Sequence, residues 1–390
     1  MLWPVDSMIA DRIARVRESG TMKMKELAGQ KKAEGKKILS FTVGEPDFDT
    51  PKNIVEAAKK ALDEGKTRYL NAAGLPELRE AIAKTSKESN AIPCDASNVL
   101  VAPTKHAMFE TIMATVNEGE EVIMPDPAWV SYEPATALAG GRAVPVTTTA
   151  EDEWRVLPET VAELITPKTK MILLNSPSNP CGSIAKKEDL KGIADLAKDH
   201  DLVVLSDEVY EKIVFDGHKH YSIAAEPDMF ERTVTISGFS KTYAMTGWRM
   251  GWLVAPKPLF KAINKIQQHS ITHCTTFAQY GALAGLVESQ APAEMMVKEF
   301  KERRDLVMKL IGEIPQLHCD VPKGAFYVFP KFDSEMNSEQ MALYLMEKAE
   351  VAMTGGSAFG AAGEGHLRLS YATSKENIAT GLERVKKALE

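Results

Sequence analysis

Cysteine is scarce in this chain, and the motifs typical of metal or thiol chemistry are missing. The 390 residues include 4 cysteines, and none has the paired spacing of a metal site or a redox CxxC motif. HExxH and GxSxG are absent as well, which disfavours the zincins and the serine hydrolases of the nucleophile-elbow type. We expect the cysteines to pack as small apolar groups; they stand at positions 94, 181, 274 and 319.

Long hydrophobic runs are missing too. No stretch of about 18 apolar residues could span a membrane, and residues 1–20 contain no apolar core of a signal peptide. The formal net charge of −7 disfavours binding to nucleic acid or to a membrane surface. We therefore expect a cytoplasmic protein with no nucleic-acid partner and no membrane partner.

What is present is enough for a large α/β protein. Hydrophobic residues make up 44% of the chain, and 390 residues predict two domains or one large domain with a satellite. Apolar strands that alternate with helices predict a mostly parallel sheet covered on both faces; they are expected at 98–101, 121–124, 142–147, 170–174, 202–206, 233–237 and 249–255. Helices are expected at 8–34, 51–64, 75–89 and 106–117, a short strand at 38–43, and a second α/β unit from 292–311, 325–330, 337–349, 366–371 and 375–389. The lysines at 23, 25, 31, 32, 36 and 37 are interpreted as a solvated helix face.

The most informative segment is 238–251, which reads GFSKTYAMTGWRMG. Lys241 lies among small side chains, where a planar ligand can approach its amine and form a Schiff base. Arg249 follows at a fixed distance and offers two parallel donors to a phosphate or carboxylate. Pyridoxal phosphate supplies an aldehyde and a phosphate on one ring. The alternative is an exposed lysine and arginine that flank a turn.

Two upstream strands also end in polar residues. The apolar run 202–206 leads into Asp207 and Tyr210, and the run 171–174 leads into a Pro-rich turn that contains Asn179. Ligands of open α/β sheets bind at the carboxyl ends of strands, so Asp207 could pair with a protonated pyridine nitrogen and Tyr210 could bond to the ring's 3′ oxygen. The alternatives are a helix N-cap at Asp207 and an Asx turn at Asn179.

With these motifs, the sequence resembles the class I/II aminotransferases of fold type I, and most closely their bacterial and archaeal aspartate aminotransferase branch. The resemblance also rests on FTVGEPDFDTP (41–51), GLPELREAIA (74–83), PDPAWVSYEP (125–134) and HLRLSYATS (366–374). It implies a large pyridoxal-phosphate-binding domain (47–290) with a mostly parallel seven-stranded sheet, and a smaller α/β domain formed by both chain ends (1–46 and 291–390). It also implies a homodimer with active sites at the subunit interface.

The resemblance assigns roles to individual residues. Lys241 is implied to bind the cofactor covalently and then to act as the base for proton transfer, while Asp207 keeps the pyridine nitrogen protonated. The other implied cofactor contacts are Asn179 and Tyr210 at the 3′ oxygen, Trp129 on the ring face, Arg249 at the phosphate, and Tyr69 at the phosphate of the neighbouring subunit. For the substrate carboxylate the resemblance implies Arg368 and the backbone of Gly44, with Trp129 and Asn179 nearby.

The expected phosphate turn departs from the family pattern. It reads Ala102-Pro103-Thr104-Lys105 instead of a glycine-rich turn, and Pro103 has no backbone N–H to donate. The N–H groups of Thr104 and Lys105 stay available at a helix N-terminus, which suits a phosphate. Gly238 stands where some relatives carry a phosphate-binding serine, so Ser240 is the more suitable hydroxyl ligand in this chain.

The resemblance also bears on substrate choice. No arginine occurs between Arg249 and Arg303, whereas many aspartate aminotransferases bind the distal carboxylate with an arginine there. Lys105, together with Ser19 of the partner subunit, matches the alternative device of the related branch. An unpaired ammonium beside the cofactor would be costly, and an acidic substrate would offset that cost. We therefore expect transfer of the amino group from aspartate to 2-oxoglutarate by a ping-pong mechanism.

Three other activities stay open from sequence. An aromatic or alanine aminotransferase would share the whole residue set. A pyridoxal-phosphate β-lyase or synthase would share Lys241 and Asp207. A non-enzymatic regulator that binds the cofactor would normally add a DNA-binding segment, and the N-terminal residues offer no basic helix-turn-helix.

Overall fold

A seven-stranded sheet forms the centre of the molecule. The computed structural model describes residues 9–16 and 20–390. The strands follow the order β2-β8-β7-β6-β5-β3-β4, and all run parallel except β8, which is antiparallel to both of its neighbours. Their bounds are β2 Val99–Val101, β3 Glu121–Asp126, β4 Arg142–Thr147, β5 Thr169–Asn175, β6 Val203–Asp207, β7 Thr233–Gly238 and β8 Gly251–Val254. The expected mostly parallel seven-stranded sheet is confirmed.

Helices cover both faces of this sheet, because strand side chains alternate between the faces. In β5, Met171 and Leu173 pack with α4 (Thr104–Thr115), α5 (Tyr132–Leu138) and α9 (Lys257–Ser270). Ile172 and Leu174 face the other side and pack with α6 (Pro158–Leu164) and α7 (Lys187–Asp199). The same side continues at β2 and β8 under α3 (Pro76–Asn90) and α10 (Thr276–Val287), with α2 (Lys52–Asp63) against α10.

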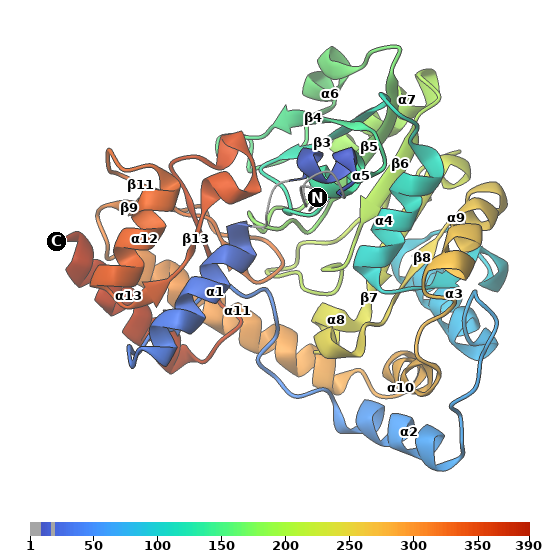
Figure 1. The fold of residues 1–390 in the computed structure, drawn as a ribbon, viewed down its shortest axis with the longest axis horizontal. Helices are drawn as coiled ribbons and strands as arrows, with labels where there is room; N and C mark the ends of the chain where they lie inside the picture. Colours follow the sequence, from blue (N-terminus) through green and yellow to red (C-terminus); the bar gives the residue numbers. More distant parts are fainter. Residues whose placement is uncertain (1–8, 17–19) are drawn as a thin grey trace, which may run out of the picture.

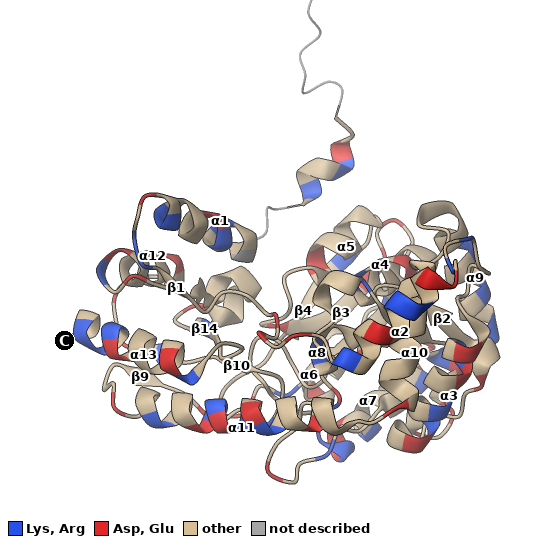
Figure 2. Cartoon of the chain, turned by 90° about the horizontal axis from the view of Figure 1, so that it is seen from below, with Lys and Arg blue, Asp and Glu red and all other residues tan. Residues whose placement is uncertain are grey.

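Helix α1 (Gly20–Ala33) lies with the C-terminal helices α12 (Ser338–Lys348) and α13 (Lys375–Leu389) beside the sheet (Figures 1 and 2). Strand β1 (Leu39–Ser40) pairs in parallel with β12 (Val351–Ala352). A three-stranded sheet has the strand order β10-β14-β13, and β11 pairs with β9 in a two-stranded sheet. The remaining elements are α1 Gly20–Ala33, α11 Ala291–Ile311, β9 Leu317–His318, β10 Tyr327–Val328, β11 Lys331–Phe332, α12 Ser338–Lys348, β13 Thr354–Gly355, β14 Leu367–Ser370 and α13 Lys375–Leu389.

The N-terminal region differs from its sequence prediction. Instead of one helix over 8–34, a 3-10 turn at Asp11–Arg15 is separate from α1, and the predicted strand 38–43 is reduced to two residues. The lysines of this region are not all a solvated face. Lys31 and Lys36 form ion pairs with Glu347 of α12 at 2.5 and 2.9 Å, so α1 is attached to the C-terminal part of the chain.

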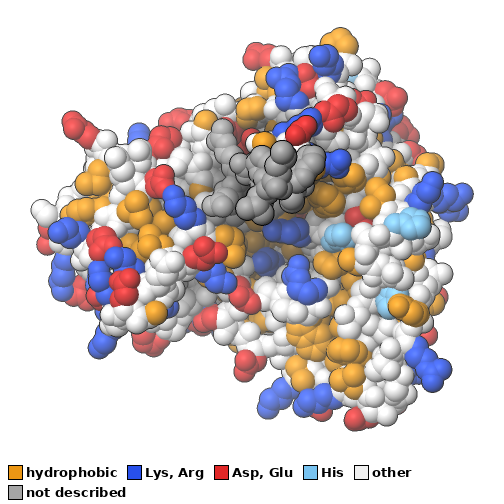
Figure 3. Space-filling view, viewed as in Figure 1, with side chains coloured by type: hydrophobic (Ala, Val, Ile, Leu, Met, Phe, Trp, Pro, Cys, Tyr) orange, Lys and Arg blue, Asp and Glu red, His pale blue; other side chains and the backbone are white. Residues whose placement is uncertain are grey.

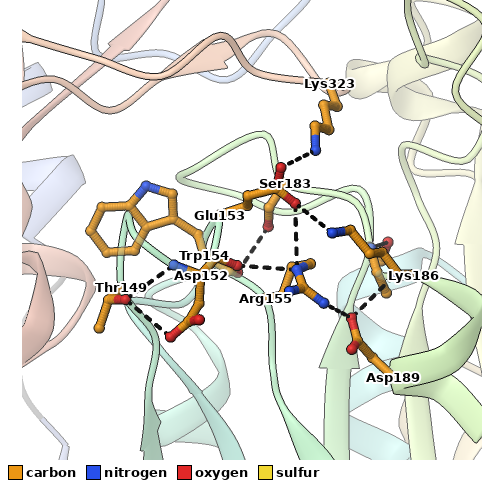
Figure 4. A network of polar contacts seen from close by, with 11 residues as sticks. Thr149, Asp152, Glu153, Trp154, Arg155, Ser183, Lys186, Asp189 and Lys323 are labelled. Carbon is orange, nitrogen blue, oxygen red and sulfur yellow. Dashed lines mark hydrogen bonds and ion pairs between the residues drawn. The ribbon is translucent and has the colours of Figure 1, made fainter.

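A polar network ties the loop 149–155 to its surroundings (Figure 4). Glu153 pairs with Lys323 at 2.6 Å and with Lys186 at 3.1 Å, and Arg155 pairs with Asp189 at 2.5 Å. Glu153 has a positive φ of 59°, a region that non-glycine residues seldom occupy. Because Lys323 belongs to the C-terminal third, the network connects the β4–α6 loop with the elements beside the sheet.

All four cysteines are free, and three of them are buried, as expected for small packing groups. Among the residues that the structure describes, no helix is both long and apolar enough to cross a membrane.

Candidate active site

The predicted site residues meet at the carboxyl edge of the parallel strands. Asn179 follows β5, Asp207 ends β6, and Lys241 follows β7 in the short helix α8 (Phe239–Thr242). In a parallel sheet these strand ends lie on one edge, where ligands bind. Lys241 is close enough for its charge to act on Asp207, and the charges of Arg368 and Arg249 act on Lys241 in turn. The fold therefore brings residues that are far apart in sequence into one site.

Lys241 has an amine that is easily deprotonated. Its Nζ donates to the carbonyl oxygen of Gly44 at 2.5 Å. Burial lowers the pKa of Lys241 from 10.5 to about 8, because the charged form loses hydration; Glu45 opposes this shift, and Arg368 adds to it. A neutral amine is the form that attacks a carbonyl, so the site favours a nucleophilic lysine near neutral pH.

Asp207 is a buried carboxylate held by two donors. Its side chain is 3% exposed, and it accepts hydrogen bonds from the Val209 N–H at 3.2 Å and from the Tyr132 hydroxyl at 2.8 Å. Burial raises the pKa of Asp207 to about 6, while both donors and Lys241 oppose the rise. No helix begins after Asp207, since residues 209–212 form turns, so the helix N-cap alternative is wrong.

Arg368 lies on β14 with only part of its donors satisfied. Its Nη1 donates to Asn179 Oδ1 at 3.0 Å, and its Nη2 donates to the carbonyl oxygen of Thr42 at 2.5 Å. The buried Nε has no partner among the described residues. The guanidinium also stands over the rings of Tyr327 and Phe359 at 4.7 and 4.8 Å. A buried cation with an unpaired donor is suited to an incoming carboxylate.

Tyr210 shares its hydroxyl hydrogen bond with Tyr327, a residue that the sequence did not indicate. The two hydroxyl oxygens are 2.8 Å apart in a buried position. Gly44 packs against the same tyrosine: a Cβ at this position would lie 2.1 Å from the Tyr327 hydroxyl. The close approach requires glycine at position 44 and fixes the backbone whose carbonyl receives Lys241.

The segment that we expect to bind the phosphate, residues 102–105, leads into helix α4. Helix α4 begins at Thr104, after Pro103, and no side chain of the described residues caps the N–H groups of Thr104 and Lys105. The Thr104 hydroxyl donates to the Ser237 carbonyl at 2.9 Å. A Cβ on Gly238 would lie 2.3 Å from that hydroxyl, so Thr104 fills the space of a side chain at position 238. Ser240 makes no side-chain hydrogen bond with the described residues.

Lys105, Trp129 and Arg249 line one cavity of about 1350 Å³ between the sheet edge and the helices α1 and α12. The Lys105 ammonium lies 4.9 Å above the Trp129 ring, a cation–π contact. Partial burial and the charge of Arg249 lower the pKa of Lys105. Arg249 is exposed, and its Nη1 donates to the Thr246 carbonyl at 2.8 Å. Lys and Arg side chains gather near the middle of the face seen in Figure 3.

Two predicted residues do not join this group within the described chain. Tyr69 is 87% exposed, and its ring meets only His273 edge-on, with centroids 5.7 Å apart. Ser19 lies outside the described residues. Tyr132 and Tyr327 were missed by sequence reasoning. Tyr132 does stand in the matched run 125–134, three residues after Trp129, but only the packing of α5 reveals that it reaches Asp207.

Comparisons with known proteins decide the family. The model of the family "Aminotransferase class I and II" matches residues 36–385. The chain belongs to the class I and II aminotransferases. This aminotransferase is 45% identical to an aspartate aminotransferase of Pyrococcus abyssi and 42% identical to aromatic-amino-acid aminotransferase 2 of Thermococcus litoralis, each alignment covering 98% of both chains. It is also similar to the solved aspartate aminotransferase from Thermus thermophilus with maleate (TM-score 0.94, 38% identity, 98% and 99% covered).

Proposed function

We propose that this aminotransferase works with pyridoxal phosphate bound covalently to Lys241. The observation that carries the proposal is the presence of two groups at the sheet edge: a partly buried lysine whose pKa falls to about 8, and a buried carboxylate, Asp207, whose two oxygens accept hydrogen bonds. The residues fit the cofactor, because an aldehyde needs the amine and a pyridinium needs the carboxylate. When bound, the cofactor supplies an electron sink for the charge left at the substrate Cα.

The remaining side chains would hold the ring in place. Asp207 would keep the ring nitrogen protonated by Coulomb attraction, and Tyr210 and Asn179 would donate to the 3′ oxygen. Trp129 would cover one ring face. The phosphate would be bound by the charge of Arg249, the free N–H groups of Thr104 and Lys105 at the start of α4, and the hydroxyl of Ser240, with Tyr69 of the partner subunit completing the site.

Lys241 would also move the proton during the reaction. With substrate and cofactor bound, the neutral amine of Lys241 would accept the proton from the substrate Cα. Its pKa of about 8 allows a base and its conjugate acid to interchange near neutral pH. Arg368 orients the substrate through its α-carboxylate with help from the Gly44 backbone, so the same bond is presented to Lys241 at each turnover.

We infer that the preferred substrate is acidic, with aspartate as amino donor and 2-oxoglutarate as acceptor in a ping-pong cycle. Lys105 supports this, because its ammonium lies in the cavity over Trp129 with no carboxylate among the described residues within ion-pair distance. The Thermus thermophilus relative was solved with maleate, a dicarboxylate. Ser19 of the partner is the second proposed ligand of the distal carboxylate.

An aromatic amino donor is the second candidate. The relative from Thermococcus litoralis is named as an aromatic-amino-acid aminotransferase. The contact between Lys105 and Trp129 gives the ammonium a partner when the substrate side chain is uncharged. This contact lowers the cost of accepting an apolar substrate, so we expect acidic substrates to be preferred and aromatic ones to be tolerated.

The proposal includes the organisation of the protein. We propose a large domain of residues 47–290 that holds the cofactor and a small domain of residues 1–46 and 291–390. The active enzyme would be a cytoplasmic homodimer, in which each subunit lends Tyr69 and Ser19 to the neighbouring site. The 87% exposure of Tyr69 supports this role, since an exposed tyrosine is available to a partner subunit.

The test compares Lys105→Leu with the wild type on aspartate, alanine and phenylalanine. Loss of the ammonium should lower kcat/KM for aspartate, by an amount that corresponds to about 1–3 kcal/mol of lost transition-state stabilisation. The kcat/KM values for alanine and phenylalanine should stay nearly unchanged. Lys257→Leu is the matched control, because Lys257 opens α9 away from the cavity. An equal loss for all three substrates would show that Lys105 serves the phosphate or the fold, and the acidic preference would lose its support.

A further inference from the structure

Tyr132 occupies a position between two groups that would hold the cofactor ring. It begins α5, is 1% exposed, and donates its hydroxyl to Asp207 Oδ2 at 2.8 Å. Its ring meets the Trp129 ring edge-on, with centroids 5.3 Å apart at 84°. Its backbone N–H bonds to the Trp129 carbonyl at 3.2 Å. Trp129 and Asp207 are therefore fixed relative to each other through one side chain.

The hydroxyl of Tyr132 is the only side-chain donor to the carboxylate of Asp207 among the described residues. The other donor is the Val209 N–H, which serves Oδ1. Burial and the nearby carboxylate raise the pKa of Tyr132 well above its ordinary value, so the phenol stays protonated and donates. Asp207 therefore faces the ring site with one oxygen bonded to backbone and the other bonded to Tyr132.

We propose that Tyr132 is a positioning residue for transamination: its hydroxyl keeps Asp207 ionised and oriented, and its ring sets Trp129. The inference rests on the proposed function of Asp207 and Trp129 as cofactor contacts. The two tasks are separable, because phenylalanine at position 132 would keep the edge-on contact with Trp129 and remove only the donor. The ring nitrogen of the cofactor would then meet a carboxylate that is less ionised and held on one side.

The charges around Asp207 determine the direction of the effect. Glu208, next in the chain, raises the pKa of Asp207, and Lys241 and the Tyr132 hydroxyl lower it. Glu208 itself is bonded to His220 at 2.9 Å, and Tyr210 is the other titratable group close by. Removing the Tyr132 hydroxyl leaves burial and Glu208 less opposed. The pKa of Asp207 is therefore higher in the variant than in the wild type. When the pH is lowered, the Asp207 carboxylate of the variant becomes protonated at a higher pH than that of the wild type.

The experiment measures the equilibrium dissociation constant of pyridoxal phosphate for the wild type and Tyr132→Phe between about pH 6 and about pH 8. Affinity should fall by about tenfold in the variant, and the loss should grow toward the acid end. Tyr344→Phe is the control, because its hydroxyl donates to the Ala388 carbonyl of the C-terminal helix. Melting curves of both variants check that each is folded.

A double-mutant cycle with Asp207→Asn separates positioning from a general structural effect. If Tyr132 acts through Asp207, the change Tyr132→Phe should have little further effect on affinity in the Asp207→Asn background. Full additivity, or a pH dependence of Tyr132→Phe equal to that of the wild type, would overturn the inference. Failure of the wild type itself to bind pyridoxal phosphate would instead reject the proposed function.

Discussion

At the residue scale, burial brings the pKa values of the two central groups toward neutrality from opposite sides. Lys241 is lowered to about 8 and Asp207 is raised to about 6, each chiefly because the charged form loses hydration. Each also stabilises the charge of the other. The site therefore combines a nucleophile that is partly neutral with an acid that is partly ionised, which suits reversible proton transfer near neutral pH.

The pH dependence of cofactor capture follows from the lysine. The protonated amine cannot attack the aldehyde, so the rate of pyridoxal phosphate binding to the cofactor-free enzyme should rise with pH, with a midpoint at about 8. Stopped-flow absorbance at several pH values measures this rate. A midpoint near 10.5, the ordinary lysine value, would show that burial does not activate Lys241.

The site residues that could be predicted from the sequence are those that follow a strand of the parallel sheet. Asn179, Asp207 and Lys241 each come directly after an apolar strand, and parallel strands end on one edge, so their meeting could be predicted. Tyr132 and Tyr327 could not. They reach the site from a helix and a small sheet, and their direction depends on how these elements pack. The hydrogen bond from the Thr104 hydroxyl to the Ser237 carbonyl could not be predicted either, because it needs the space that glycine leaves at position 238.

At the element scale, the loop 149–155 is held by charges that come from two separate segments of the chain. Glu153 contacts Lys186 before α7 and Lys323 before β10. These lysines lower the pKa of Glu153 to about 2. The loop has two successive residues with positive φ, Glu153 and Trp154, a conformation that persists only when the surroundings hold it. Figure 4 shows the lysines converging on the carboxylate.

Glu153→Gln should destabilise the enzyme modestly. Because the side chain is 44% exposed, solvent screening limits the expected loss to about 0.2–1 kcal/mol of unfolding free energy at neutral pH. The folded-state pKa of about 2 lies below the ordinary 4.5. The stabilisation is therefore present above about pH 4.5 and is lost as the pH falls through about 2.

Urea unfolding at several pH values, with and without added salt, checks the prediction. The exposed Glu163 of α6, which forms no ion pair with the described residues, supplies the control Glu163→Gln, and this change should leave the unfolding free energy nearly unaltered. A difference between Glu153→Gln and the wild type that persists unchanged at pH 2 and in high salt would contradict an electrostatic role for the network.

Helices and strands of the sheet were predicted well because their periodicity is strong. The predicted strand 170–174 is β5 Thr169–Asn175, and the predicted helix 75–89 is α3 Pro76–Asn90. The prediction of one helix over residues 8–34 was wrong for a physical reason. Residues 8–34 have few breakers and many good helix formers, but the 3-10 turn Asp11–Arg15 packs on α5, whereas α1 contacts α12, β12 and β13. The two segments are therefore placed by different long-range contacts.

At the scale of the whole molecule, the proposed homodimer makes each active site a joint product of two subunits. Hybrid dimers test this directly. Lys241→Ala and Tyr69→Ala homodimers should both be impaired, whereas a hybrid of the two should contain one intact site, with Lys241 from one subunit and Tyr69 from the other. Activity of the separated hybrid should approach half that of the wild type. An inactive hybrid would show that Tyr69 serves its own subunit.

The covalent attachment of the cofactor tests the central claim most directly. Purified enzyme loaded with pyridoxal phosphate is reduced with borohydride, digested and mapped by mass spectrometry. The label should lie on Lys241, and the variant Lys241→Ala should retain the fold but carry no label and lose transamination by several orders of magnitude. A label on Lys105 or another lysine, or near-normal turnover of Lys241→Ala, would contradict the account.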